Sequence, residues 1–278
     1  MTDLNYYILR YGEIALKGKN RKSFEQKLVN NIRSYILNKY NAESKINRIR
    51  GRLVLEVSNE VDLRPIFGLT SYSKAIKISN NIEDIKDSAI KLFNNYKNVK
   101  SFKVQTYRLD KSYELISPEV SKIVGSVIYE KFKVDVDLKK PELIFGIEIH
   151  KDYAYLFTDS VKCFSGLPLG SSDTIHLFFE NDNRSILSVL ELMKRGCKVI
   201  LITQDGSINK NKIRLLELYN NYYKLQFVKN IDKEEFAYAS PVYINKIHKE
   251  QDFTLYPIAL LSDKEVDEEL KKYDIFKT

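Results

Sequence analysis

The predicted fold rests on nine consecutive residues, Leu177-Phe178-Phe179-Glu180-Asn181-Asp182-Asn183-Arg184-Ser185. An apolar strand precedes a short polar turn, and an amphipathic helix follows the turn as far as Lys194-Arg195-Gly196. This layout is typical of nucleotide-binding loops, in which glycine backbone N–H groups at a helix N-terminus hold phosphate. The turn contains no glycine and carries two carboxylates. The layout therefore predicts an α/β sheet, while the composition of the turn bears on whether the protein is an enzyme or a binding protein.

The sequence around this turn predicts an alternation of strands and helices throughout residues 166–278. Strands are predicted at residues 174–179, 198–203, 224–228 and 253–261, and helices at residues 184–195, 208–222 and 262–272. Such an alternation implies a mostly parallel sheet with helices on its faces. Residues 165–173, which precede it, have the glycine, proline and serine content of a linker.

Two α+β units are predicted before this linker. The first combines a strand at residues 6–11, a helix at 22–40 with apolar residues at every fourth position, and an alternating strand at 53–57. The second combines helices at 82–96 and 117–132 with strands at 101–108, 145–150 and 153–159. The predicted domains are therefore residues 1–77, 78–165 and 166–278.

The composition of the 278 residues is that of a globular protein, with 44% hydrophobic and 29% charged residues. We expect a cytoplasmic protein with no membrane contact, because no apolar run reaches the roughly 18–20 residues that span a bilayer and no secretory signal is visible. Cys163 and Cys197 form neither a disulfide framework nor a zinc pattern. His150, His176 and His248 have no partner at metal-ligand spacing, so no metal site is predicted.

The net charge of +8 lies entirely in the first 80 residues, which hold 15 Lys and Arg against 7 Asp and Glu. A localised basic surface is typical of nucleic-acid binding, although charge alone leaves a solubilising surface equally open. The spacing Arg48-x-Arg50-x-Arg52 favours binding, because alternate residues of one strand share a face. Gly18 favours it too, since it lets the backbone approach a phosphate near the start of a helix. The expected RNA contacts of this region are Lys17, Lys19, Arg21, Lys22, Arg48, Arg50 and Arg52.

A resemblance to a known family begins at Arg10-Tyr11-Gly12-Glu13-Ile14-Ala15-Leu16-Lys17-Gly18-Lys19-Asn20-Arg21, followed by Phe24-Glu25 and Asn31-Ile32. It continues in order through Phe67-Gly68-Leu69, Phe102-Lys103-Val104, Ser117-Pro118-Glu119-Val120, Val136-Asp137-Leu138, Gly166-Leu167-Pro168-Leu169-Gly170 and Lys194-Arg195-Gly196. On these segments the chain resembles the ThiI-type tRNA 4-thiouridine synthetases, which are tRNA sulfurtransferases. The resemblance covers about residues 5–200, and its first segment is the most specific.

The resemblance implies a ferredoxin-like domain, a THUMP domain and a Rossmann-like ATP-pyrophosphatase domain of the PP-loop type. In the family the first two domains bind tRNA, with THUMP at the acceptor end. The third adenylates a uridine before sulfur is transferred from a cysteine persulfide. Lys103, Arg108 and Lys111 are then the expected THUMP contacts, whereas Tyr107 and Tyr113 either stack on bases or pack in the core.

The polar turn departs from the family pattern SGGxDS. The matching residues are Glu180, Asn181, Asp182, Asn183, Arg184 and Ser185, of which only the final serine is retained. Side chains replace both glycines, and a carboxylate about 4 Å from a phosphate charge costs roughly 4 kcal/mol at an effective dielectric near 20. Mg²⁺ held by these carboxylates, or Arg184, would offset part of this cost.

The sulfur chemistry of the family also lacks a clear carrier. Cys197 is expected to be a packing cysteine, because it lies between a glycine and an apolar strand. Cys163 matches no catalytic position, although its place near the linker leaves exposure open. The roughly 110 residues after the linker are expected to omit further nucleotide and cysteine elements of the family.

We therefore expect a tRNA-binding protein with a truncated, degenerate PP-loop domain, no catalytic residues and no cofactor. The expected partners are tRNA, at its acceptor-end region, together with a catalytic partner protein or a second copy in a homodimer. The alternative is an active tRNA sulfurtransferase that uses ATP and Mg²⁺ to adenylate a tRNA uridine for thiolation. A third possibility makes the C-terminal domain a protein–protein interaction module.

Overall fold

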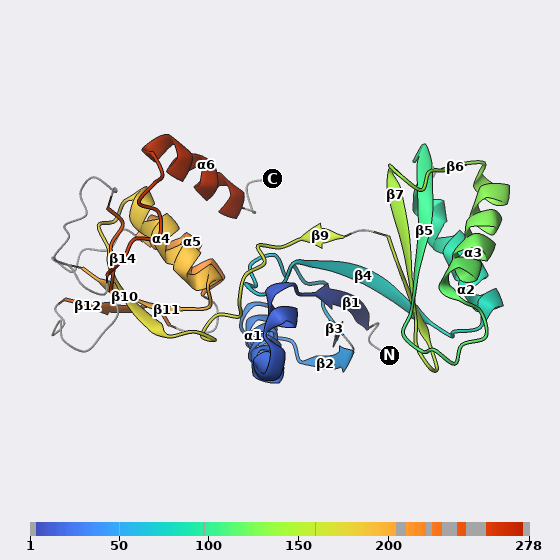
Figure 1. The fold of residues 1–278 in the computed structure, drawn as a ribbon, viewed down its shortest axis with the longest axis horizontal. Coiled ribbons are helices and arrows are strands. Elements are labelled where there is room, and N and C mark those ends of the chain that lie inside the picture. The colour runs from blue at the N-terminus through green and yellow to red at the C-terminus, as the bar shows by residue number, and fades with distance from the viewer. Residues whose placement is uncertain are drawn as a thin grey trace. The chain divides into compact units, whose positions relative to one another are not determined.

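The protein was analysed as a computed structural model, which describes residues 4–49, 51–96, 98–158, 160–203, 210–220, 224–229, 238–242 and 254–274. Its contacts divide the chain into two compact units, each built from separate segments (Figure 1). Unit 1 comprises Met1–Leu9, Lys45–Glu60 and Tyr72–Val161. Unit 2 comprises Arg10–Ser44, Val61–Ser71 and Lys162–Thr278. The division at residues 77 and 165 into three continuous domains stays a prediction.

A nine-stranded sheet forms most of unit 1. Its strands are β1 (Asn5–Arg10), β2 (Ser44–Ile49), β3 (Arg52–Val57), β4 (Ser71–Ile78), β5 (Ser101–Arg108), β6 (Asp135–Val136), β7 (Leu143–Ile149), β8 (Ala154–Phe157) and β9 (Val161–Lys162). They follow the order β2-β3-β1-β4-β8-β7-β5-β6, and β9 pairs with β4. Strands β5 and β7 are parallel, whereas β8 is antiparallel to both β7 and β4.

Two helices, α2 (Ile82–Phe93) and α3 (Ser117–Phe132), lie side by side against β5 and β7 in Figure 1. Helix α2 continues into the short η3 (Asn94–Tyr96). The alternation of β7 places Phe145, Ile147 and Ile149 in one buried cluster with residues of α2 and α3. Glu148 lies between them in the strand and therefore faces the other side of the sheet, where it pairs in register with Tyr155.

Arg48 and Arg52 lie on different strands, so the prediction that they share one strand face was wrong. Strand β2 ends at Ile49 and β3 begins at Arg52, with a turn at Gly51 between them. Gly51 has a φ of +80°, which glycine adopts without strain and which is typical of tight hairpins. Spacing alone predicts a continuous strand for the alternating arginines, because it does not reveal a turn. Arg50 lies outside the described residues.

A five-stranded parallel sheet forms the C-terminal part of unit 2. Its strands are β10 (Thr174–Phe178), β11 (Lys198–Ile202), β12 (Gln226–Val228), β13 (Tyr238–Ala239) and β14 (Thr254–Leu255), and its helices are α4 (Asn183–Lys194), α5 (Lys210–Tyr219) and α6 (Asp263–Tyr273). The order is β12-β11-β10-β13-β14, with every described pairing parallel. The predicted Rossmann-like α/β architecture is confirmed. The chain leaves β10 toward one edge and later returns to the other, so the strand order reverses between β10 and β13.

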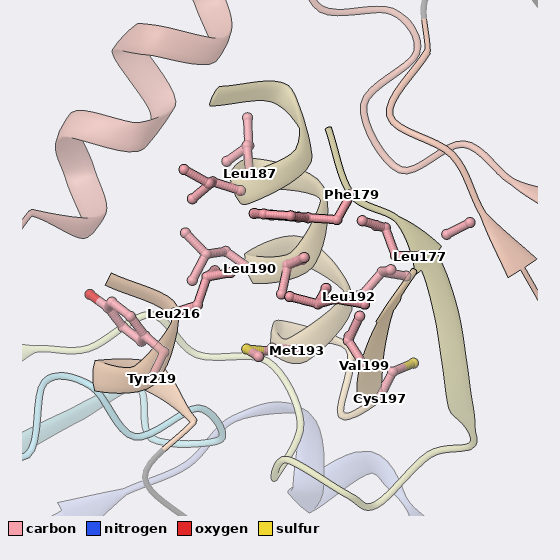
Figure 2. Close-up of a cluster of buried hydrophobic side chains, with 14 of the residues drawn as sticks. Leu177, Phe179, Leu187, Leu190, Leu192, Met193, Cys197, Val199, Leu216 and Tyr219 are labelled. Atoms are coloured by element: carbon pink, nitrogen blue, oxygen red, sulfur yellow. The ribbon is translucent and has the colours of Figure 1, made fainter. Parts of the chain in front are cut away.

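The core of this sheet is shown in Figure 2, where side chains of α4, including Leu187 and Leu190, gather with Phe179 and Val199. The same buried cluster includes Phe67 and Leu169, which lie before β10 in the chain. Apolar side chains from segments far apart in the sequence therefore complete one core.

Residues 165–173 are not the free linker that their composition predicted. Gly166, Leu167, Pro168 and Leu169 are buried. The Leu167 N–H donates to Lys194 O at 2.9 Å, and the Gly170 N–H donates to Gly196 O at 2.7 Å. The glycines supply positive φ angles and the leucines supply apolar surface, so this stretch packs as part of unit 2.

Helix α1 (Arg21–Tyr40) also belongs to unit 2 and confirms the helix predicted at residues 22–40. Two short 3₁₀ turns, η1 (Glu13–Leu16) and η2 (Gly18–Asn20), lead into it. The buried Asn31 side chain of α1 donates its Nδ2–H to Leu169 O at 3.0 Å. Within the described residues, no helix has the length and apolar content needed to cross a membrane.

Candidate functional site

The polar turn after β10 binds its own backbone. Asp182 caps α4, with Oδ1 accepting the Ser185 N–H at 2.7 Å. Ser185 is fully buried, and its Oγ accepts the Glu180 N–H at 3.0 Å. Asn181 has a φ of +57°, a conformation that this short polar residue tolerates better than most. Side chains of the turn thus satisfy backbone N–H groups that a phosphate-binding loop would direct at its ligand.

Arg184, in the first turn of α4, is buried with 6% of its surface exposed. Its Nε donates to Pro241 O at 3.0 Å, and its Nη2 donates to Ile258 O at 3.0 Å. Its Nη1 donates to Leu261 O at 2.8 Å and lies 3.4 Å from Asp263 Oδ1. These acceptors follow β13 and β14 in the chain, on the side of the sheet's strand-order reversal where open α/β folds bind ligands. The guanidinium joins α4 to those segments.

Two further polar residues of the turn differ in their surroundings. Asn183 donates its Nδ2–H to Asp267 Oδ1 of α6 at 2.8 Å. Glu180 is exposed at the surface of the turn. The turn therefore presents a carboxylate to solvent, while its cation, Arg184, is buried.

Both cysteines are poor nucleophiles in this fold. Burial raises the pKa of the Cys163 thiol to about 12, with Asp62 adding a smaller effect in the same direction. Burial also raises the pKa of Cys197, which lies in the core shown in Figure 2. The prediction that Cys197 is a packing residue is confirmed. Neither side chain forms an appreciable amount of thiolate at neutral pH.

The basic loop at residues 17–22 has two exposed cations, Lys19 and Lys22. Lys17 is partly buried, with Nζ 5.0 Å from the ring centre of Phe24. Arg21 is held within the fold, because its Nε lies 2.7 Å from Glu25 Oε1. Gly18 has a φ of +52°, so the turn itself requires this glycine.

The hairpin between β2 and β3 presents Arg48 to solvent. Arg52 has a different environment, since its guanidinium forms an ion pair with the buried Glu148 of β7. It also lies over the Tyr107 ring, 4.4 Å from the ring centre. Arg52 therefore braces β3 against β5 and β7 within unit 1.

The RNA contacts predicted in the second α+β unit also differ in their exposure and in their partners within the fold. Lys111 is exposed, and Lys103 is partly buried on β5. Arg108 donates from Nη1 to Tyr113 O at 2.9 Å and to Leu115 O at 3.2 Å, so it stabilises the segment that follows β5. The Tyr113 hydroxyl donates to Asn80 O at 2.7 Å, which supports the packing role for this tyrosine.

Sequence patterns did not reveal an aromatic and cationic cluster around β8. Lys77 Nζ lies 4.5 Å from the ring centre of Tyr153 and 5.4 Å from that of Tyr6. The His150 ring stacks on Tyr153 at 4.7 Å. Burial, with smaller contributions from Arg52 and Lys77, lowers the pKa of His150 to about 4, so the imidazole is neutral at pH 7.

The histidines build no metal centre in the described parts of the chain. There, no group of three or more His, Cys, Asp or Glu side chains could hold a metal ion. His176 is buried on β10, and burial lowers its pKa. His248 lies outside the residues that the structure describes.

Two family domains match the chain. Residues 6–73 match the ThiI ferredoxin-like domain, and residues 79–159 match the THUMP domain. These matches correspond to the two predicted α+β units.

Curated relatives extend the similarity into the C-terminal sheet. A "Probable tRNA sulfurtransferase" of Thermotoga maritima is 30% identical over 243 residues, covering 81% of this chain and 61% of the relative. A protein of the same name from Mycoplasmopsis agalactiae is 39% identical over 198 residues, covering 70% of this chain and 50% of the relative. The chain thus spans between half and 61% of the length of these relatives.

Two solved structures share the fold. The crystal structure of PH1313 from Pyrococcus horikoshii is 27% identical with a TM-score of 0.82, covering 96% of this chain and 99% of that one. A 4-thiouridine synthetase in complex with RNA and ATP is 22% identical with a TM-score of 0.80, covering 98% of this chain and 85% of that one. At that identity the second comparison supports the fold alone.

Proposed function

Because this chain carries a ThiI ferredoxin-like domain followed by a THUMP domain and is related to the tRNA sulfurtransferases, we propose that it binds tRNA and lacks an ATP-pyrophosphatase and sulfurtransferase activity of its own. It would act as an RNA-binding adaptor or as one component of a modification system. Catalysis would then come from another chain, and a homodimer would be one form of the assembly.

Exposed cations on both α+β parts of the chain support tRNA binding. Lys19, Lys22, Arg48 and Lys111 are exposed and can each meet a phosphate. Lys17 and Lys103 are partly exposed, and each adds positive charge to its own unit. By analogy with the family, the region contacted would be the acceptor end.

Arg21, Arg52 and Arg108, which were expected to contact RNA, have a structural role in this proposal. Each guanidinium has partners inside the fold, so these residues position the surface rather than contact phosphate. Removing one would disturb the local structure as well as the charge.

The buried hydrogen-bonded guanidinium of Arg184 is the observation that carries the loss of ATP chemistry. In an open α/β sheet this edge is the place for a bound nucleotide, and here the Arg184 guanidinium donates to carbonyls of the chain itself. The cation expected to offset the carboxylates of the turn is engaged with main-chain oxygens instead.

The backbone and charge of the turn also do not fit a bound pyrophosphate. Asp182 accepts the Ser185 N–H, and Glu180 presents a carboxylate to solvent. A carboxylate about 4 Å from a phosphate charge costs roughly 4 kcal/mol at an effective dielectric near 20, or nearly a thousandfold in affinity. The raised pKa of both buried cysteine thiols argues against either of them as a persulfide carrier.

The test has an RNA arm and an ATP arm, both on the full chain. Binding of fluorescently labelled, unfractionated bacterial tRNA should be detectable and should weaken steeply with salt, because each phosphate contact releases counterions. Undetectable or salt-independent binding would refute the RNA proposal. Calorimetry with Mg²⁺-ATP should show no binding, and no AMP or pyrophosphate should form when tRNA is added.

Formation of AMP and pyrophosphate by the wild type with tRNA would instead support the alternative, an active tRNA sulfurtransferase. One variant with four substitutions tests whether the turn causes the loss of ATP binding. Glu180→Ser, Asn181→Gly, Asp182→Gly and Arg184→Asp together rebuild the family pattern. Gain of ATP binding by this variant alone, in a protein that keeps its circular dichroism spectrum, would support the degeneracy of the turn.

A further inference from the structure

Unit 2 brings a cation of the C-terminal sheet domain next to the basic loop. Arg195 ends α4, and its Nη1 lies 3.9 Å from Glu13 Oε2 of η1. Its side chain is 72% exposed, so most of the guanidinium is available to solvent. The two residues are separated by 182 positions in the sequence but belong to the same compact unit.

A continuous series of hydrogen bonds fixes the position of this end of α4. The Ser172 Oγ donates to Arg195 O at 2.9 Å, and the Gly170 N–H donates to Gly196 O. The same stretch is held to α1 by Asn31, whose Nδ2–H donates to Leu169 O at 3.0 Å. Arg195 is therefore preorganised beside the loop that leads into α1.

The partner of Arg195 is a carboxylate just before the loop, whereas the next carboxylate along the chain, Glu25, is buried and pairs with Arg21. Between residues 10 and 24, Glu13 is the one acidic residue among five cations. Lys17 follows Glu13 by four residues, or about 8 Å at the 3₁₀ rise of roughly 2 Å per residue.

An exposed ion pair of this length is weak, so a phosphate can take the place of the carboxylate. Arginine suits the exchange, because its planar fork binds two phosphate oxygens at once. Arg195 would meanwhile screen the negative charge of Glu13, which precedes the loop, when no RNA is bound.

We propose that Arg195 is an RNA phosphate contact of the C-terminal domain, extending the surface of the basic loop, with Glu13 as the partner that RNA displaces. The inference rests on the proposed tRNA binding at Lys19 and Lys22. It gives the C-terminal domain a direct part in holding RNA that does not depend on a nucleotide site.

The test compares variants of the full chain binding labelled, unfractionated bacterial tRNA. Arg195→Ala should weaken binding about tenfold and reduce the magnitude of the salt slope by about 1. Glu13→Gln should strengthen binding, since it removes both the competing partner and the repulsion. In the Glu13→Gln background, Arg195→Ala should cost more than it does in the wild type, because no ion pair with Glu13 has to break before Arg195 meets the phosphate.

Lys264→Ala is the matched control, because Lys264 is 87% exposed and also forms an ion pair, 4.0 Å from Glu268. An Arg195→Ala protein that binds like Lys264→Ala would overturn the inference, provided that Lys19→Ala and Lys22→Ala still weaken binding. If all of these variants bind like the wild type, the proposed RNA surface itself fails. Thermal unfolding should be unchanged in Arg195→Ala, since the side chain is exposed.

Discussion

Replacing Arg184 by alanine should unfold the C-terminal part of unit 2 at markedly lower denaturant concentration. The substitution removes a guanidinium that is hydrogen-bonded to the carbonyls of Pro241, Ile258 and Leu261. Two of these hydrogen bonds are buried, so their oxygens would lose the partner that compensates for their burial.

The size of the effect follows from those contacts. A hydrogen bond to a charged group contributes about 1.5–3 kcal/mol, and a buried acceptor left without its partner costs about 1–3 kcal/mol. The variant also avoids the desolvation cost of burying the guanidinium charge, and this offsets part of the destabilisation. We therefore expect a loss of about 3–4 kcal/mol, a large share of the roughly 5–15 kcal/mol that stabilises a typical domain.

Urea unfolding followed by far-ultraviolet circular dichroism measures this loss. Arg195→Ala is the control, because it removes the same side-chain type from the other end of α4, where it is exposed, and should change stability by no more than about 0.5 kcal/mol. Arg184→Lys should be intermediate, since lysine keeps the charge but cannot reach three carbonyls with a rigid fork. Equal midpoints for Arg184→Ala and Arg195→Ala would refute the buried role of Arg184.

Three further predictions concern single groups. Acid should weaken the fold through His150, because its folded pKa of about 4 lies below the ordinary value. The unfolded chain binds the extra proton, so the free energy of unfolding falls as pH drops from about 6.5 to 4. A His150→Gln variant should lose that part of the pH dependence of the urea midpoint. Cys163, with its pKa raised to about 12, should react with iodoacetamide at pH 8 far more slowly in the folded protein than in urea, and equal rates would contradict its burial. Gly18→Ala should cost about 1 kcal/mol because the residue has a φ of +52°, measurable by thermal unfolding against Ala15→Gly as an exposed control in the neighbouring η1.

The elements themselves were predictable because their signals are local. The helix at residues 22–40 was marked by apolar residues every four positions, and it forms as α1. The alternation after residue 173 predicted a parallel sheet, and its described pairings are parallel. Periodicity is a property of neighbouring residues, so it predicts a helix or a strand independently of the rest of the chain.

The two wrong predictions concern positions in the tertiary structure that residue spacing or composition does not determine. The alternating arginines at 48–52 resembled a strand face, but a glycine with positive φ placed a turn among them. Residues 165–173 have the composition of a linker, yet Leu167 and Leu169 are buried. The turn at Gly51 is a local backbone conformation, whereas the packing of Leu167 and Leu169 depends on residues distant in the sequence.

The sequence by itself determined the order of strands and helices, the family resemblance, and the concentration of positive charge in the first 80 residues. Only the tertiary structure decided which of those charges are available to a ligand. Arg52 has a carboxylate partner brought from far along the chain, whereas Lys19 and Lys22 stay exposed. The physical reason is that the net charge of a segment is additive along the sequence, while burial and pairing of each charge depend on which distant groups the fold places beside it.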